Sequence, residues 1–88
     1  MLTLNEKPNG QYRYWNHLSV TTGYGKDAIS AYLEAFEIME NELKNYFPEA
    51  EGVFHFQKQL TSYPHYNGDW YESRFCILLS GHPFKYIK

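Results

Sequence analysis

Residues 26–47 read KDAISAYLEAFEIMENELKNYF, and this stretch decides the fold. Its large apolar residues recur at spacings of three and four, which places them on one stripe of a helix. The stripe consists of Ile29, Tyr32, Leu33, Phe36, Met39, Leu43, Tyr46 and Phe47. Gly25 or Asp27 can cap the start of the helix. Pro48 ends it, because the residue before a proline avoids the helical region. The sequence therefore predicts one long helix that packs through this stripe.

The opposite side of the helix has a different character. Ile38 falls beside Ala31 and Ala35 when the chain advances about 100° per residue. The predicted outer surface presents Glu34, Glu37, Ile38 and Glu42. Single exposed apolar residues such as Ile38 are common on proteins. The alternative interpretation is that this side contacts a partner, which could be a second copy of the chain in a homodimer.

Three further stretches alternate apolar and polar residues, as half-buried strands do. They are residues 11–24, 52–60 and 70–80, and a turn at Gly23-Tyr24-Gly25 leads from the first of them into the helix. The side chains predicted to face the helix are Tyr12, Tyr14, Leu18, Val20, Phe54, Phe56, Leu60, Tyr71, Phe75, Ile77 and Leu79. Val53 is predicted to face the other way. The third stretch is the most apolar and is expected at the centre of the sheet, whereas Lys58 suits an edge strand.

The Asn-Gly pair at residues 67–68 predicts a two-residue hairpin turn. This turn would pair Tyr66 with Asp69. Pro64 would then stand at a hydrogen-bonded position of the ladder, although it has no N–H to donate. We therefore expect the ladder to weaken there and residues 61–68 to project as a tip.

These elements predict one α+β domain over residues 1–88. The expected architecture is one long helix packed on a three- to four-stranded, mainly antiparallel sheet. The order along the chain is β-α-β-β, and the third strand lies between the first and the second after a right-handed crossover. Residues 1–9 are expected to be a loosely attached start, and residues 82–88 can add a short edge strand.

Composition excludes several classes of protein. With 88 residues, 43% of them hydrophobic, the chain can form one modest core. A net charge of −2 argues against direct nucleic-acid binding. The sequence holds no apolar run of membrane-spanning length and no signal-peptide pattern. Its single cysteine, Cys76, fits a reducing cytoplasm.

One helix covers only one face of a sheet, so the other face is the first candidate for function. Its expected residues are rich in aromatics and arginine, which are the usual anchors of protein interfaces. Together with the tip they give the predicted partner-binding set: Arg13, Trp15, His17, His55, Tyr63, Tyr66, Trp70 and Arg74. The alternatives are that a terminus covers this face, or that it binds single-stranded nucleic acid or a small ligand.

No motif in the sequence names a reaction or a cofactor. His17, His55, His65 and Cys76 are metal-ligand types, but they lack a paired spacing. The segment at residues 17–20, HLSV, matches one half of the signature of two-histidine phosphoesterases, and the chain has no second matching segment. We therefore expect a protein that is not an enzyme and holds no metal or cofactor.

In format, the chain resembles the small phage-encoded inhibitors, of which the anti-CRISPR proteins are the best-known group. The resemblance lies in a short acidic chain, rich in Tyr and Phe, with one long helix on a small antiparallel sheet. It implies a non-enzymatic inhibitor or adaptor that blocks a protein partner, such as a nucleic-acid-handling defence complex. It also implies a place in the host cytoplasm.

Overall fold

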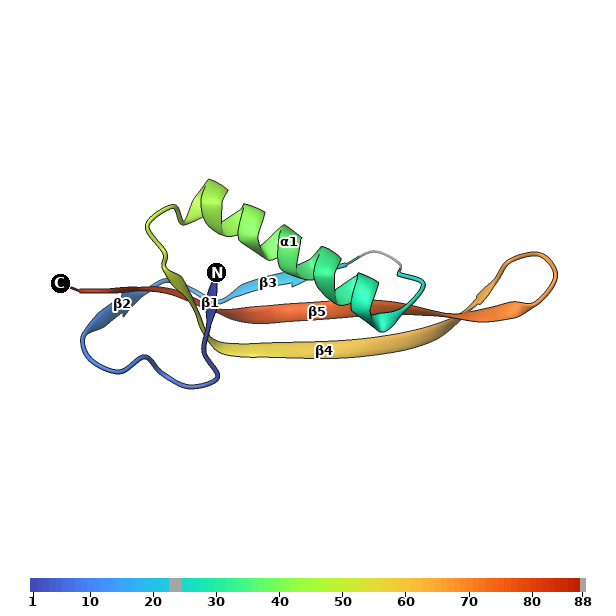
Figure 1. Cartoon of the computed structure of the whole chain (residues 1–88), viewed down its shortest axis with the longest axis horizontal. Helices are drawn as coiled ribbons and strands as arrows, with labels where there is room; N and C mark the ends of the chain where they lie inside the picture. Colours follow the sequence, from blue (N-terminus) through green and yellow to red (C-terminus); the bar gives the residue numbers. More distant parts are fainter. Residues whose placement is uncertain (23–24, 88) are drawn as a thin grey trace.

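One helix lies along one face of a five-stranded mixed sheet (Figure 1), which confirms the α+β class. The computed structural model describes residues 1–22 and 25–87. The elements are β1 (Leu2–Thr3), β2 (Tyr12–Tyr14), β3 (Leu18–Thr21), α1 (Ala28–Tyr46), β4 (Gly52–Tyr66) and β5 (Tyr71–Tyr86). The number of strands therefore exceeds the three or four expected from the sequence.

The long hairpin of β4 and β5 forms the middle of the sheet. β5 pairs antiparallel with β4 on one side and with β2 and β3 on the other, while β1 pairs parallel with the start of β4. The segment predicted as one strand is thus split into β2 and β3. The chain start that was expected to be loose contributes β1, and the expected tail strand is the end of β5. The predicted glycine turn into the helix involves Gly23 and Tyr24, which lie outside the described residues.

Local chemistry sets both ends of α1. Of the two predicted candidates, Asp27 is the N-cap: its carboxylate accepts a hydrogen bond from the Ser30 backbone N–H at 2.7 Å. The Ser30 hydroxyl also contacts this carboxylate at 3.2 Å. At the other end, Phe47 N–H donates to the Leu43 carbonyl at 2.8 Å. The chain then leaves the helix before Pro48.

The buried stripe of the helix is rotated from the predicted one: Met39 and Leu43 are buried as expected, but other members change places. Ala31 and Ala35, placed on the outer side by the sequence pattern, are fully buried. Ile29 and Leu33, predicted to lie in the core, are 74% and 61% exposed. Ile38 is half-buried and packs against the core. The small alanine side chains let the helix backbone approach the sheet closely, so the buried stripe follows the alanines instead of the largest side chains.

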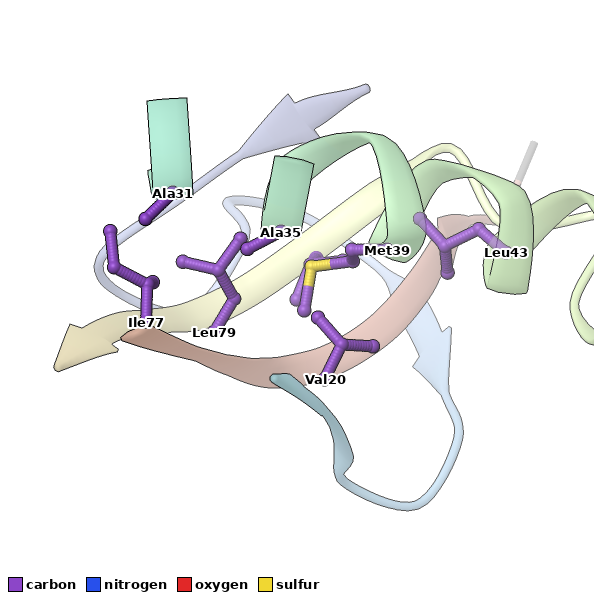
Figure 2. Close-up of a cluster of buried hydrophobic side chains, with 8 residues drawn as sticks. Val20, Ala31, Ala35, Met39, Leu43, Ile77 and Leu79 are labelled. Atoms are coloured by element: carbon purple, nitrogen blue, oxygen red, sulfur yellow. The ribbon is translucent and has the colours of Figure 1, made fainter. Parts of the chain in front are cut away.

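The core fills the space between α1 and the middle of the sheet. Figure 2 shows Met39 lying over Val20, while the β5 residues Ile77 and Leu79 lie beneath Ala31 and Ala35. Leu43 points toward the sheet one helical turn after Met39. Of these, Val20, Ile77 and Leu79 face the helix as the strand pattern predicts. Val53 joins the same cluster and is fully buried, so its predicted outward orientation is wrong.

A β-bulge in β4 explains the error at Val53. The register shifts between Phe54 and Gln57, and His55 takes a backbone φ of 51°. The bulge inserts one extra residue into the strand and so reverses the alternation of faces. Before the bulge, Val53 faces the helix and Phe54 faces away; after it, Lys58 faces the helix. The prediction that Phe54 faces the helix is therefore also wrong.

A second reversal separates β2 from β3. Tyr14 pairs with Phe84 and packs on Phe54 at 5.6 Å between ring centroids, on the face away from the helix. Tyr12 also packs on Phe54, at 5.5 Å. Trp15 lies on the helix side, where its ring is 5.9 Å from that of Phe47. The two tyrosines predicted to face the helix therefore cover the opposite face, because the register against β5 shifts by one residue between the two short strands.

The turn of the hairpin lies one residue later than predicted. Tyr66 pairs with Tyr71 instead of Asp69, and Asn67 N–H donates to the Trp70 carbonyl at 3.1 Å. Gly68 has a φ of 107° and occupies the first central position of the turn, where a type II′ turn requires glycine.

The shifted turn removes the expected conflict at Pro64. Hydrogen-bonded and non-hydrogen-bonded pairs alternate along an antiparallel ladder. Counting back from the bonded pair of Asn67 and Trp70, the pair of Pro64 and Ser73 is non-hydrogen-bonded. The proline nitrogen therefore faces the free edge, and the ladder runs through this position without the predicted weakening.

The hairpin makes the molecule elongated, with extents of 58 × 24 × 18 Å. Figure 1 shows the far part of β4 and β5 continuing beyond the N-terminal end of α1 as a two-stranded arm. The predicted projecting tip at residues 61–68 belongs to this longer arm.

Candidate interaction surface

A groove runs between the first half of α1 and β4, with a volume of about 380 Å³. Its lining residues are Ala28, Ile29, Tyr32, Lys58, Leu60 and Ile77. Ile29, Leu33 and Leu60 are 74%, 61% and 51% exposed. Leu33 follows Ile29 by one helical turn, so it extends the same apolar side of α1. Exposed apolar surface of this kind is a mark of interaction sites.

Lys58 is the one charged side chain among the described residues that line this groove. Its ammonium group lies 5.1 Å from the centre of the Tyr32 ring, at cation–π distance. The aromatic ring thereby holds a positive charge at the rim of an apolar surface.

The start of α1 forms the other end of the groove. The hydrogen bond from Ser30 N–H, supported by the Ser30 hydroxyl, lowers the pKa of Asp27. These hydrogen bonds favour the ionised carboxylate and cap the first turn of the helix, which carries Ala28 and Ile29.

The outer edge of β4 beside the groove has unpaired backbone groups. In the described chain, the part of β4 from Lys58 onward pairs only with β5. The bonded pair of Asn67 and Trp70 fixes the alternation of the ladder. From Gln57 onward, after the bulge, the odd-numbered residues of β4 therefore point their backbone groups at β5. The N–H and C=O groups of Lys58, Leu60 and Ser62 point to the free edge.

Independent contacts on the other side of β5 give the same alternation. Phe75 and Gly25 exchange both backbone hydrogen bonds, at 2.9 and 3.0 Å, and the Ile77 carbonyl accepts from Thr22 N–H at 3.0 Å. Odd-numbered residues of β5 therefore point away from β4, and even-numbered ones point toward it. The hydrogen bonds at the turn and those on the far side of β5 therefore agree on which backbone groups of β4 are free.

The free edge has a definite beginning and end. Leu4 N–H donates to the Val53 carbonyl, and Phe56 N–H donates to the Leu4 carbonyl, each at 2.9 Å. The N-terminal segment thus covers the edge up to Phe56. At the other end, Pro64 has no N–H. We call the stretch between them, residues 58–62, the edge window.

The predicted partner-binding residues of the sheet divide between the two faces. Arg13 and Trp15 lie on the helix side: the Arg13 guanidinium forms an ion pair with Glu49 and lies 5.3 Å from the Trp15 ring. His17 and His55 lie near His82, with ring centroids 5.2 and 6.3 Å from it. Sequence reasoning did not select His82, whose position in the tail concealed its place in β5.

The predicted residues of the arm also divide. Tyr66 packs against Tyr71 at 5.1 Å between ring centroids, on the helix side of the hairpin. Tyr63 pairs with Arg74 on the opposite face, where the guanidinium binds Glu72 at 2.7 Å. Trp70, in the turn, is 62% exposed. No single surface brings these residues together with His17 and His55.

The alternative site on the helix is changed by the helix rotation. Glu34 and Glu37 are exposed, but Glu42 is only half-exposed and Ile38 packs on the core. The predicted patch of an apolar residue among glutamates therefore does not form.

The face away from the helix is partly filled by its own aromatic side chains. Phe54 and Phe84 are 3% and 0% exposed, and Tyr12 packs on both. This cluster turns much of the predicted binding face near β2 into a second small core. The groove and the edge window, in contrast, keep their apolar side chains and strand backbone exposed.

Sequence reasoning missed the groove because it assigned Ile29, Leu33 and Leu60 to the core. The available signal was the spacing of Ala31, Ala35, Met39 and Leu43, which recur every fourth residue and form the buried stripe.

Among the described residues, no three His, Cys, Asp or Glu side chains converge in a way that could hold a metal ion. No helix in the described chain has the length and apolar character needed to cross a bilayer. Comparison of the chain with protein-family models, curated proteins and solved structures found no match.

Proposed function

We propose that the chain is a non-enzymatic binding module that contacts a protein partner through the groove and the edge window. The observation that supports this most directly is the exposed apolar strip of Ile29, Leu33 and Leu60 beside unpaired strand backbone. Water solvates such a surface poorly, and an open strand edge is a template for pairing with another chain.

In this proposal the protein acts by occupying a surface of its partner, as an inhibitor or adaptor does. An inhibitor of a nucleic-acid-handling complex is one instance, and the resemblance to phage-encoded inhibitors motivates it. The small size of the domain is compatible with such a role, because a standard interface needs only about 800 Å² from each partner.

A charge-matched pair of double variants tests the proposal. Ile29→Lys with Leu60→Lys places two lysines on the groove. Asn41→Lys with Ser19→Lys adds the same charge at exposed positions elsewhere. All four positions are exposed, so both proteins should keep the fold, which circular dichroism and thermal melting can check.

Each tagged protein is used to capture partners from extracts of the source cells, with recovery measured by quantitative mass spectrometry. We expect the groove variant to lose at least about tenfold of the partner, since interface energy is concentrated in a few central residues. The control should retain it. A partner that the groove variant keeps and the control loses would contradict the proposal.

A further inference from the structure

We propose that the edge window binds an extended segment of the partner as an added antiparallel strand, with an apolar residue opposite Leu60 and an acidic residue opposite Lys58. This inference rests on the proposed function and specifies how the partner is recognised. The observation behind it is the juxtaposition of free strand backbone, an apolar groove and one positive charge.

The backbone of the edge window can form a regular ladder with such a segment. Lys58, Leu60 and Ser62 each present both an N–H and a C=O to the edge. In an antiparallel ladder, residues that face each other in this way exchange two hydrogen bonds. An extended segment therefore satisfies all the free groups of the window without any change in β4.

The side chains of the added strand fall where the groove can receive them. Residues directly opposite in an antiparallel pair point to the same face. Leu60 pairs with Ile77, which faces the helix, and Leu60 itself lines the groove. The residue opposite Leu60 therefore also faces the helix and meets the exposed side of α1 at Ile29. An apolar side chain suits this position.

Lys58 fixes the charge and the direction of the segment. In an antiparallel arrangement, the residue opposite Lys58 comes two positions after the one opposite Leu60 and points to the same face. Lys58 is the single charge among the described lining residues. A carboxylate at this second position complements it. The predicted recognition pattern is therefore an apolar residue, any residue, and then Asp or Glu.

The ends of the window argue against a second copy of the chain as its occupant. A symmetric pairing of two β4 strands that used all three free residues would be centred on Leu60. It would place Pro64 of one copy opposite Phe56 of the other, where the Leu4 carbonyl already binds the Phe56 N–H. A short segment that spans only residues 58–62 meets no such obstruction.

Two synthetic peptides of the same composition test the binding mode. The first is the blocked peptide Thr-Thr-Leu-Thr-Asp-Thr-Thr, and the second has the reversed sequence Thr-Thr-Asp-Thr-Leu-Thr-Thr. Each is titrated into the ¹⁵N-labelled full chain, and amide chemical shifts are followed. We expect the first peptide to shift the amides of Lys58, Leu60 and Ser62, with an affinity about tenfold higher than that of the reversed peptide.

Protein variants separate the roles of charge and apolar contact. Leu60→Ala should weaken binding of the first peptide about tenfold, whereas Tyr46→Ala, another exposed apolar residue, should leave it unchanged. Lys58→Glu should also weaken it. A peptide with Lys in place of Asp should bind Lys58→Glu better than it binds the unmodified chain.

Several results would overturn the proposal. These are tighter binding of the reversed peptide, shifts confined to the aromatic face around Phe54, no binding of the first peptide at millimolar concentration, or concentration-dependent dimerisation that shifts the same three amides. If the first peptide does not bind but the groove variant loses its partner in the capture experiment, added-strand recognition is wrong and the proposed function stands. If the first peptide does not bind and the groove variant keeps its partner, the groove is not the binding surface.

Discussion

The rotation of α1 predicts that Ala35→Leu is far more damaging than Ile29→Ala. Ala35 is fully buried, so the extra atoms of leucine have to displace the sheet or their neighbours. Overpacking of this kind costs about 1–3 kcal/mol. For a domain of this size, each kcal/mol lowers the melting temperature by about 4–8 °C.

The Ile29→Ala variant removes mostly exposed surface. Ile29 is 74% exposed, so only about a quarter of its side chain is buried. Full burial of an isoleucine side chain contributes about 1.5–3 kcal/mol, and the quarter that is lost corresponds to about 0.4–0.8 kcal/mol. The higher helix propensity of alanine returns about 0.4 kcal/mol. The net change should therefore lie within about 0.5 kcal/mol of zero.

Urea unfolding measured by circular dichroism can compare both variants with the unmodified chain at low protein concentration, where partner or self-contacts do not contribute. A common slope against urea is required for the free energies to be compared. The sequence pattern alone predicts the reverse order, because it places Ile29 in the core and Ala35 outside. A larger loss in Ile29→Ala than in Ala35→Leu would show that the buried stripe, and with it the groove, has been assigned to the wrong side of the helix.

Three further substitutions test local features of the fold. Gly81→Ala should destabilise the chain by about 1–3 kcal/mol or more, because a Cβ there would lie 2.1 Å from a methyl carbon of the fully buried Val53. An unchanged melting temperature would contradict this close packing. Thr22→Val should cost about 1–3 kcal/mol by leaving the buried Ile77 N–H without its acceptor, now 2.8 Å away; Thr22→Ser, which keeps the hydroxyl, should lose clearly less in the same melting experiment. Asp27→Ala should lower stability at pH 7. The pKa of Asp27 is lowered in the folded state, so its contribution is complete above the ordinary aspartate pKa of about 4 and is lost as the pH falls through the lowered folded value. The difference between Asp27→Ala and the unmodified chain should accordingly shrink in acid melts, and a difference that grows there would refute the capping role.

Residue periodicity predicted the parts of the fold in which a regular pattern persists. The helix and its N-cap at Asp27 follow from local sequence, and the strand with Ile77 and Leu79 is the one that pairs on both sides. The helix and its cap depend mainly on neighbours along the chain, and the central place of this strand is indicated by its nearly unbroken apolar run.

The errors occur where one residue changes the phase of a pattern. No glycine at His55 signals the bulge in the sequence. The bulge nevertheless places every earlier residue of β4 on the face opposite to the one predicted by alternation. The change between Tyr14 and Leu18 has the same effect on the first predicted strand. The alternation of apolar and polar residues does not reveal either reversal. Each depends on which face of the sheet offers packing partners to the large side chains.

The helix shows a different reason for failure. A pattern weighted by side-chain size selects Ile29 and Leu33, whereas close packing on a sheet selects Ala31 and Ala35. The apolar residues left outside then supply the groove. The surface that carries the proposed function is thus made of residues that a size-weighted pattern assigns to the core.

The position of the hairpin turn connects this groove to the free edge. With the turn one residue earlier, as the Asn-Gly pair predicts, even-numbered residues of β4 would point their backbone groups at β5. The free groups would then belong to Gln57, Gln59 and Thr61, whose side chains face away from the helix. With the turn as found, the free groups belong to Lys58, Leu60 and Ser62, on the groove side. Any added strand therefore places the side chains opposite these residues against α1, and Pro64 marks where that strand must end.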